Sequence, residues 1–494
     1  MKKIIFGLLC LAVSTQIYAS DKYRKPESFV LQCSDGNVLR AYDMALTVVE
    51  GNVKLWQHGL LDTSRPVLMA GKGYARPWTR DASYNTFFCA GLIYPEVAKN
   101  TLLSVLLKED DVIRIGGQYW DCISWVTGAW AYYTYTGDEN FLRTGYSAAV
   151  NSLAYFREKE FDNTTGLFCG PGWSDGIGGY PEPYNNAGGS SFILDYAKHN
   201  AHIDKIRMKA LSTNCLYYNA YRKAALMGKL LDRPAKECAD LAEKADALKA
   251  AINRHLWINS AGHFAYFLDA KGRLDHSQEG LGHAQAILFN VADTNRAELI
   301  FKNQYVSPHG IPCTWPLFQR FSNDRIGRHC GTVWPQIQGF WALAASSEGN
   351  LAIMDREFKA LTDMALASND FSEIYHPFTG QPYGGFQVGR LWHSQPAQTW
   401  AATAYIAMIY KGVMGMRFDP NGLFFKPVVP PRIARLSLAG IKYRDMTLDI
   451  KIYGSGIKIK RCAIDDRIME RPRIAATMTG HHIITIYMED DTER

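Results

Sequence analysis

Two carboxylic acids stand in loop sequences rich in glycine and aromatic residues. Asp175 follows Trp173 and Ser174 in the segment 169–176, and Glu373 lies in a second loop, 371–380. A carboxyl group beside an indole in a partly apolar pocket is easily kept protonated, as a general acid requires. Ser-Asp-Gly is also an ordinary turn tripeptide, so a purely structural turn is the alternative for Asp175. Two carboxyl groups flanking one bond are the usual requirement for glycoside hydrolysis, and only a fold can bring these two together.

A third segment combines an aromatic ring with two opposite charges. Trp78 is followed by Thr79, Arg80 and Asp81. An adjacent Arg and Asp can hold two neighbouring sugar hydroxyls while the indole stacks on the pyranose ring. The alternative is that Asp81 caps a helix opening at Ala82, with Arg80 paired nearby.

A fourth segment, 331–336, carries Trp334 directly before Pro335. Proline suits the first turn of a helix, and an apolar run follows as far as Ala345. Trp334 is therefore expected either to floor a sugar subsite or to plug the interior of a helical barrel.

The composition is that of a globular protein with a binding groove. Apolar residues make up 47% and charged residues 21% of 494 residues, while aromatic residues reach 13%. Flat rings in excess suit a groove that stacks on sugars or bases. The net charge is only +6 and no basic block occurs, which argues against a nucleic-acid partner. The nine cysteines after Cys10 show no zinc or redox spacing, so neither metal nor cofactor is expected.

The first residues resemble a secretory signal peptide. Lys2 and Lys3 precede a short apolar run, 4–13, and Ala19 offers a cleavage site before Ser20. The apolar run is about half the length that a membrane span needs. We therefore expect a signal peptide over 1–19, export to the periplasm or medium, and no membrane span.

Helical periodicity dominates the chain from about Leu39 to Tyr410. Leu216, Ala220 and Ala224 begin one apolar stripe, and a second follows after Pro234. The expected helices are 39–56, 83–94, 96–107, 121–135, 140–157, 216–231, 241–252, 282–290, 293–303, 334–346, 353–367 and 396–411. Beyond Gly412 the pattern changes to alternation, with apolar residues at every second position of 448–452. The sequence thus predicts a catalytic domain over 20–411 and a β-sandwich-like module over 412–494.

These segments, in this order, resemble those of the six-hairpin (α/α)6 glycosidases: glycogen-debranching amylo-α-1,6-glucosidases, trehalases and family 63 α-glucosidases. The matching segments are Trp78-Thr79-Arg80-Asp81, Asp121 with Trp125 and Tyr135-Thr136-Gly137-Asp138, Trp173-Ser174-Asp175, Gly331-Thr332-Val333-Trp334-Pro335, and Ser372-Glu373-Ile374-Tyr375 with Pro377, Thr379 and Gly380. One difference is Arg328-His329-Cys330, where debranching enzymes usually carry Tyr-His-Asn.

The resemblance implies an (α/α)6 toroid that inverts the anomeric centre of a glycoside. Asp175 would protonate the glycosidic oxygen, and Glu373 would activate a water held between carboxyl groups roughly 6.5–9.5 Å apart. The residues expected to bind substrate are Trp78, Arg80, Asp81, Trp120, Asp121, Trp173, Trp334, Tyr375, Trp392 and Gln395.

The resemblance favours an exported exo-α-glucosidase-like enzyme acting on α-linked oligosaccharides. An α-mannosidase or α-rhamnosidase specificity on the same barrel is one alternative. A glycoside phosphorylase, in which phosphate replaces water, is another, although Glu373 would then be unnecessary. A non-catalytic glycan-binding protein would keep the aromatic groove and need neither carboxylate. A polysaccharide lyase would favour a strongly basic groove, which the near-neutral charge does not support.

Overall fold

Two kinds of helix alternate along the chain, and they differ in how many of their faces are buried. Every residue of α15 (Thr399–Ala407) is buried, as is every residue of α13 (Pro335–Glu348) as far as Ser346. By contrast, α10 (Ala235–His255) buries one stripe that includes Leu241, Ala245 and Leu248. A helix that is buried all round belongs inside a protein, and an amphipathic helix belongs on its surface. The burial patterns therefore assign the helices to two layers.

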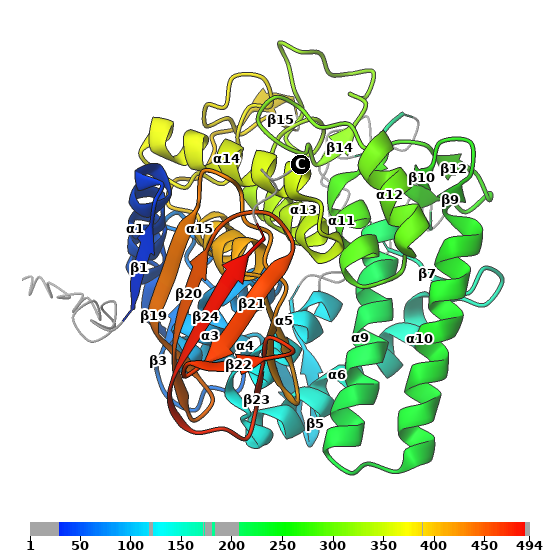
Figure 1. Ribbon diagram of the computed structural model, residues 1–494. Helices are drawn as coiled ribbons and strands as arrows, with labels where there is room; N and C mark the ends of the chain where they lie inside the picture. Colours follow the sequence, from blue (N-terminus) through cyan, green and yellow to red (C-terminus); the bar gives the residue numbers. More distant parts are fainter. Residues whose placement is uncertain are drawn as a thin grey trace, which may run out of the picture.

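The inner helices form a closed ring in the computed structural model, which describes residues 29–117, 122–170, 172, 180–182, 207–387 and 389–489. Each inner helix packs against the next along the chain, and α15 packs against α2 to close the ring. Helices α13 and α15 of this ring are labelled in Figure 1. The inner helices are α2 (Thr79–Asn85) with its π-helical continuation η2 (Thr86–Ala90), α5 (Trp125–Thr136), α9 (Leu211–Leu230), α11 (Gly280–Leu288), α13, and α15 with its continuation η4 (Met408–Val413).

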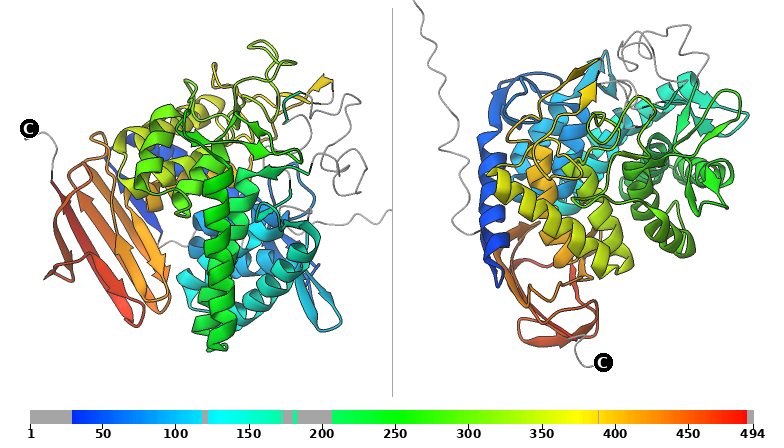
Figure 2. Two further views of the ribbon diagram at one scale, coloured as in Figure 1. Left: turned by 90° about the vertical axis from the view of Figure 1, so that its right-hand side faces the viewer. Right: turned by 90° about the horizontal axis from the view of Figure 1, so that it is seen from above.

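The outer helices cover this ring and complete the predicted toroid (Figure 2). They are α1 (Gly36–Gly51), α4 (Pro95–Ser104), α6 (Glu139–Glu160), α10, α12 (Thr294–Asn303) and α14 (Leu351–Ser368). The short helices α3 (Gly91–Ile93) and η3 (Cys122–Ser124) lie in connections. The arrangement confirms the (α/α)6 fold class. Helix boundaries differ from the predicted ones by a few residues because capping groups, such as Asp138 before α6, lie just outside the apolar pattern.

The carboxyl-terminal module contains the predicted strands, together with one strand from the other end of the chain. A six-stranded sheet has the order β1-β19-β20-β24-β21-β22, in which only β20 and β24 are parallel neighbours, and a three-stranded sheet joins β17, β18 and β23. The strands are β1 (Val30–Cys33), β17 (Met416–Asp419), β18 (Gly422–Phe425), β19 (Arg435–Tyr443), β20 (Met446–Tyr453), β21 (Ile459–Ile464), β22 (Arg467–Met469), β23 (Arg473–Ala475) and β24 (Gly480–Met488).

Strand β20 shows the alternation that the sequence predicts, with Leu448, Ile450 and Ile452 buried. Strand β1 was not predicted, because four residues carry too little periodicity to be recognised. It pairs antiparallel with β19, from Val30 opposite Ala439 to Cys33 opposite Leu436.

Short strand pairs brace the loops between helices. They are β2 (Val53–Trp56) with β3 (Arg65–Leu68), β4 (Leu106–Glu109) with β5 (Val112–Ile115), β6 (Phe161–Asp162) with β7 (Leu167–Phe168), β9 (Trp257–Ile258) with β10 (His263–Phe264), β13 (Gln278–Glu279) with β14 (Thr314–Trp315), β15 (Phe386–Gln387) with β16 (Arg390–Leu391), and β11 (Phe267–Leu268) between β8 (Lys209–Ala210) and β12 (Leu274–Asp275). Across the described ranges, no helix combines the length and apolar character that crossing a membrane demands. The nine described cysteines are all free thiols.

Candidate active site

The loops that lead into three inner helices meet at one end of the ring. Gly71, before α2, pairs with Gln398, before α15, and Val333, before α13, pairs with Tyr375 in the loop 371–398. Because a loop that precedes a helix lies at its amino-terminal end, these bridges gather the loops at the mouth where the inner helices begin. The mouth therefore collects the Trp78, Trp334 and Glu373 segments that the sequence singled out.

Glu373 is the buried carboxylate at this mouth. The residue is 1% exposed, and both of its carboxylate oxygens have donors. The Tyr74 hydroxyl donates to Oε1 at 2.5 Å, and the Arg328 guanidinium donates to Oε2 at 2.7 Å. Its backbone N–H donates to the carbonyl of Gln395 at 2.9 Å, which fixes the loop at that point.

Tyr74 acts as a donor throughout the ordinary pH range. Burial, followed by the charge of the neighbouring Glu373, raises the pKa of Tyr74 well above its ordinary value. A phenol that stays protonated donates its hydrogen, so the Glu373 oxygen that it contacts must accept. Each carboxylate oxygen has two lone-pair positions, which leaves room for a further donor such as water.

Contacts to both its side chain and its backbone fix the position of Arg328. Its side chain donates to the carbonyl of Gly384 at 3.1 Å and lies 5.2 Å from the centre of the Trp334 ring. Gly385 has φ +73°, and a Cβ there would lie 2.3 Å from the Cα of Arg328. Only glycine permits this approach, so the pair Gly384-Gly385 is part of what presents Arg328 to Glu373.

His329 is buried next to Trp334, and its imidazole is neutral. Its ring is 5.0 Å from that of Trp334. Burial, with the positive charges of Arg328 and Arg80, holds the pKa of His329 well below its ordinary value. A histidine in this state is an electrically neutral part of the wall rather than a cation.

Helix α2 brings Trp78, Arg80 and Asp81 to the mouth. The helix begins at Thr79, so Trp78 occupies the capping position and Asp81 lies inside the first turn, 3% exposed. The alternative in which Asp81 caps a helix opening at Ala82 is therefore wrong, because the helix already begins at Thr79. An acidic residue in a first turn is still stabilised by the helix dipole. The guanidinium of Arg80 lies 5.8 Å from the Trp78 ring, and that of Arg76 lies 4.5 Å from it.

The side chains of Trp334 and Tyr375 are buried beneath the loops at the mouth. Trp334 is 2% exposed, and its indole N–H donates to the carbonyl of Arg328 and the hydroxyl of Thr332, both at 3.0 Å. The Tyr375 hydroxyl is buried, donates to the carbonyl of Asp370 at 3.1 Å and accepts from the N–H of Ser372 at 2.9 Å. Both side chains thus support the loops that carry Arg328 and Glu373.

Trp392 and Gln395 complete the described part of the site. Trp392 is half-buried, donates to the carbonyl of Gln387 at 3.0 Å and carries the Arg390 guanidinium 4.1 Å from its ring centre. The Gln395 amide fits closely against Gly73, where a Cβ would lie 2.4 Å from its Oε1. The loops before α2 and α15 are therefore packed directly on each other beside Glu373.

Four of the predicted site residues lie outside the described residues: Trp120, Asp121, Trp173 and Asp175. On either side of Asp175, the described Gly172 and Tyr180 both contact Tyr266. A Cβ on Gly172 would lie 2.7 Å from that ring, and Tyr180 stacks on it with ring centres 5.6 Å apart.

Three residues of the site were not predicted to be functional. Tyr74 and Arg328 contact Glu373, yet Arg328 was noted only as a departure from Tyr-His-Asn. Glu279, which is fully buried at the start of α11, accepts from the backbone N–H of Ser212 at 3.0 Å and so satisfies the first turn of α9. Its sequence signal is an acidic residue directly before Gly280, where a helix begins.

A family model for the mannosylglycerate hydrolase MGH1-like glycoside hydrolase domain matches residues 123–401, which is more than half of the chain. The chain belongs to this family. Residues 123–401 are therefore a domain of the glycoside hydrolase type, and the six-hairpin resemblance is confirmed. A model for the carboxyl-terminal domain of glycosyl hydrolase family 65 matches residues 416–466. Among curated proteins, none matches the chain in sequence.

Several solved structures share the fold of this MGH1-like chain. A family 63 mannosylglycerate hydrolase from Thermus thermophilus is 14% identical with a TM-score of 0.56, and the match covers 75% of this chain and 99% of that one. A family 78 rhamnosidase of Bacillus sp. GL1 is 13% identical with a TM-score of 0.60, covering 94% of this chain. A sialidase is 14% identical with a TM-score of 0.65, covering 86% of this chain. The match spans 45% of the rhamnosidase and 38% of the sialidase.

Proposed function

We propose that this hydrolase inverts the configuration of an α-linked glycoside, with Glu373 as the base that activates water. The observation that carries the proposal is a buried carboxylate at the mouth of the ring that accepts from Tyr74 and Arg328. These donors fix the orientation of the carboxylate, and its remaining lone pairs can accept from a water molecule. Proton removal by a positioned carboxylate is the step that an inverting glycosidase needs.

Asp175 is the proposed general acid. Its assignment rests on the order of the sequence motifs, in which Trp173-Ser174-Asp175 precedes Glu373. In this mechanism, Asp175 gives its proton to the leaving oxygen while water attacks the opposite face of the sugar. Arg80 and Asp81, brought to the mouth by α2, would hold hydroxyls of the sugar, and Trp78 would lie against its ring.

Two sugar specificities are proposed for this site. An exo-α-glucosidase-like activity follows from the debranching-type motifs around Trp334 and Glu373. An α-mannosidase acting on an α-mannoside with an acidic aglycone is the second candidate, and two observations favour it. The family model takes its description from a mannosylglycerate hydrolase. In addition, Arg76 and Arg80 both lie over the Trp78 ring at the mouth, and guanidinium groups suit a carboxylate.

The stereochemical course tests the mechanism, and the same experiment names the sugar. Proton NMR of the anomeric region would follow wild-type protein acting on α-glucosides, α-mannosides, α-mannosylglycerate and α-rhamnosides, with Asp175→Asn alongside. The β-anomer should appear first from an α-substrate, and only with wild type. Retention of the α-configuration would refute inversion. Turnover that depends on phosphate would make the protein a phosphorylase, and binding without turnover would make it a glycan-binding protein.

Export is proposed on the leader sequence 1–19, which lies outside the described residues. The charged start, the short apolar run and the small residue at Ala19 are the features that carry it. Mass spectrometry of the protein recovered from the periplasm or medium should give a chain that begins at Ser20. A protein that stays in the cytoplasm with Lys2 and Lys3 intact would refute the proposal.

A further inference from the structure

A second pocket lies at the opposite end of the inner ring from Glu373. Its volume is about 230 Å³, and it is lined by residues from the middle and later parts of inner helices, with Thr127 near the start of α5, together with the start of β17. Tyr135 lies in the last turn of α5, Asn290 follows α11, and Lys411 lies in η4, after α15. The catalytic loops precede these helices, whereas this pocket forms where the helices end. It is therefore a separate site that the proposed hydrolysis does not use.

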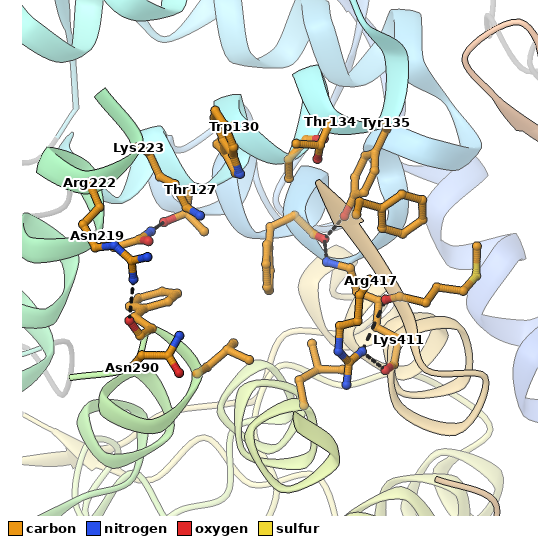
Figure 3. A pocket seen from close by; sticks show the side chains of 17 residues that line it. Thr127, Trp130, Thr134, Tyr135, Asn219, Arg222, Lys223, Asn290, Lys411 and Arg417 are labelled. Atoms are coloured by element: carbon orange, nitrogen blue, oxygen red, sulfur yellow. Dashed lines mark hydrogen bonds between the residues drawn. The ribbon is translucent and has the colours of Figure 1, made fainter. Parts of the chain in front are cut away.

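Four cationic side chains line this pocket. Arg222 and Lys223 come from α9 on one side, and Lys411 and Arg417 come from η4 and β17 on the other (Figure 3). In the described part of the chain, no aspartate or glutamate lines the pocket, and none of the four cations has an ion-pair partner. A cluster of cations that is partly removed from water and has no carboxylate is costly unless an anion joins it.

On the β17 side, the described partners of the cations are all neutral. The Lys411 ammonium donates to the carbonyl of Phe87 and lies 3.6 Å from the centre of the Phe87 ring. The Arg417 guanidinium donates to the carbonyl of Lys411 and, at 3.0 Å, to the hydroxyl of Ser346. Burial, followed by the charge of Arg417, lowers the pKa of Lys411 well below its ordinary value. A bound anion would reverse that shift, because it favours the protonated amine.

On the α9 side, too, the described partners of the cations are neutral. The Lys223 ammonium lies 5.0 Å from the centre of the Trp130 ring, and Arg222 donates to the hydroxyl of Tyr218 at 3.2 Å and the carbonyl of Phe289 at 3.3 Å. Burial and the neighbouring Arg222 lower the pKa of Lys223 to about 8. Both sides of the pocket therefore hold positive charge against carbonyls, hydroxyls and rings.

The remaining lining suits an organic molecule rather than a bare ion. The Trp130 ring faces the pocket between the two cationic sides, and the amides of Asn219 and Asn290 add neutral hydrogen-bonding groups (Figure 3). Asn219 is oriented by its bond to the hydroxyl of Thr127 at 3.0 Å. Separated positive sides with an aromatic surface between them fit a ligand that carries charge at both ends.

We propose that this pocket binds a small organic polyanion, with Arg222 and Lys223 holding one oxyanion group and Lys411 and Arg417 holding another. The oxyanion groups can be carboxylates or phosphoryl groups, since guanidinium and ammonium donors recognise both. The site is built jointly by the helical ring and the β17 strand, so a bound ligand would bridge the ring and the module that follows it.

Calorimetric titration of the full-length protein tests the proposal. The probes are citrate for polycarboxylates, pyrophosphate for phosphoryl compounds, and inorganic phosphate for a single oxyanion, each against potassium chloride of equal ionic strength. We expect saturable binding of citrate or pyrophosphate with one molecule per chain, and at least ~10-fold weaker binding of inorganic phosphate. The stronger of the two probes identifies the ligand class.

Variants locate the binding. Lys223→Gln should weaken the preferred probe at least ~10-fold, the effect expected for loss of one charge-assisted contact. Lys411→Met should do the same from the opposite side, with circular dichroism showing that each variant folds. Lys229→Gln changes an exposed lysine of the same helix and should bind as wild type does. Hydrolysis measured without added anion should be unchanged in Lys223→Gln. Absence of saturable binding by both polyanions, or binding that Lys223→Gln leaves unaltered, would overturn the proposal.

Discussion

The two ends of the inner ring differ in whether their described cationic side chains have carboxylate partners. At the end where the helices begin, Arg328 is matched at 2.7 Å by Glu373, and His329 is kept neutral. At the end where they finish, Arg222, Lys223, Lys411 and Arg417 face a pocket to which the described residues contribute no carboxylate. We call the first end balanced, because Arg328 there has a carboxylate partner, and the second end unbalanced, because the described cations there have none and so suit an anion. The same ring of helices thus presents two binding surfaces of different chemistry.

The largest expected effect is the loss of the base at the balanced end. Glu373→Gln keeps the shape of the side chain but cannot take a proton, so kcat should fall by at least ~10²-fold, the range of general acid–base contributions. Steady-state assay on the substrate found by NMR measures this. Glu348→Gln, an exposed glutamate at the end of α13, is the matched control and should retain full activity. Near-normal turnover of Glu373→Gln would remove Glu373 from its role.

Removing the cation from the balanced end should destabilise the protein. Arg328→Met leaves Glu373 buried without its ion-pair partner, which costs about 3 kcal/mol of unfolding free energy for a pair of this kind. Urea unfolding measures the loss, and kcat should fall with it because the carboxylate loses one of its two fixed donors. Arg325→Met, at an exposed position three residues earlier, serves as control. Unchanged stability in Arg328→Met would show that the ion pair with Glu373 does not stabilise this end of the ring.

Replacing a cation by methionine at the unbalanced end should raise the unfolding free energy rather than lower it. Lys411→Met removes a buried ammonium that has no carboxylate, so the unfolding free energy should rise by about 1 kcal/mol. The carbonyl of Phe87 keeps a donor, since the Tyr135 hydroxyl also contacts it at 2.7 Å. Urea unfolding in chloride buffer, without polyanions, measures the gain. A loss as large as that of Arg328→Met would contradict the contrast between the ends.

The smallest effect is a pH dependence that Lys223 should produce. Its pKa is about 8 in the folded protein and about 10.5 in the unfolded chain. Above pH 8 this lysine therefore stays protonated in the unfolded chain while it loses its proton in the folded protein, so its own contribution to stability rises with pH in that window. The groups facing Lys223 across the pocket are Lys411 and Arg417, with Arg222 beside it.

Urea unfolding at pH 7.5 and pH 9.5 measures this contribution as the difference between Lys223→Gln and wild type, because cysteines and tyrosines of the unfolded chain titrate over the same range and act equally in both proteins. Relative to wild type and to Lys229→Gln, Lys223→Gln should lose stability between the two pH values. The affinity for a polyanion should fall as the pH rises, because Lys223 loses its proton. An identical slope in Lys223→Gln would show that the lysine keeps its ordinary pKa.

Much of the fold could be predicted because it follows from local periodicity. The apolar stripes of α9 and α10, the proline that opens α13 and the alternation in β20 are all short-range signals. Glu373 could be predicted for a similar reason, since its loop carries a dense cluster of glycine, proline and aromatic residues.

The partners of Glu373 could not be predicted in the same way. Tyr74 and Arg328 reach it from two other loops, and only the ring of helices sets their distance from it. The cationic pocket was missed for a related reason. Lys223 and Lys411 look like surface lysines in sequence, because nothing local tells that α9 and η4 lie in the inner layer. Burial of a charged side chain is a property of the assembled ring.

Strand β1 has a consequence for how this chain is made. It pairs with β19, so the first described strand finds its neighbour only after the whole ring has been synthesised. During translation, β1 leaves the ribosome early with an unpaired edge, and such edges invite pairing with other chains. Closing the sheet also joins the two ends of the chain across a very long loop, which slows folding. Pairing of β1 with β19 is therefore expected to come late in folding, and truncation before β19 would leave β1 without its neighbour in the sheet.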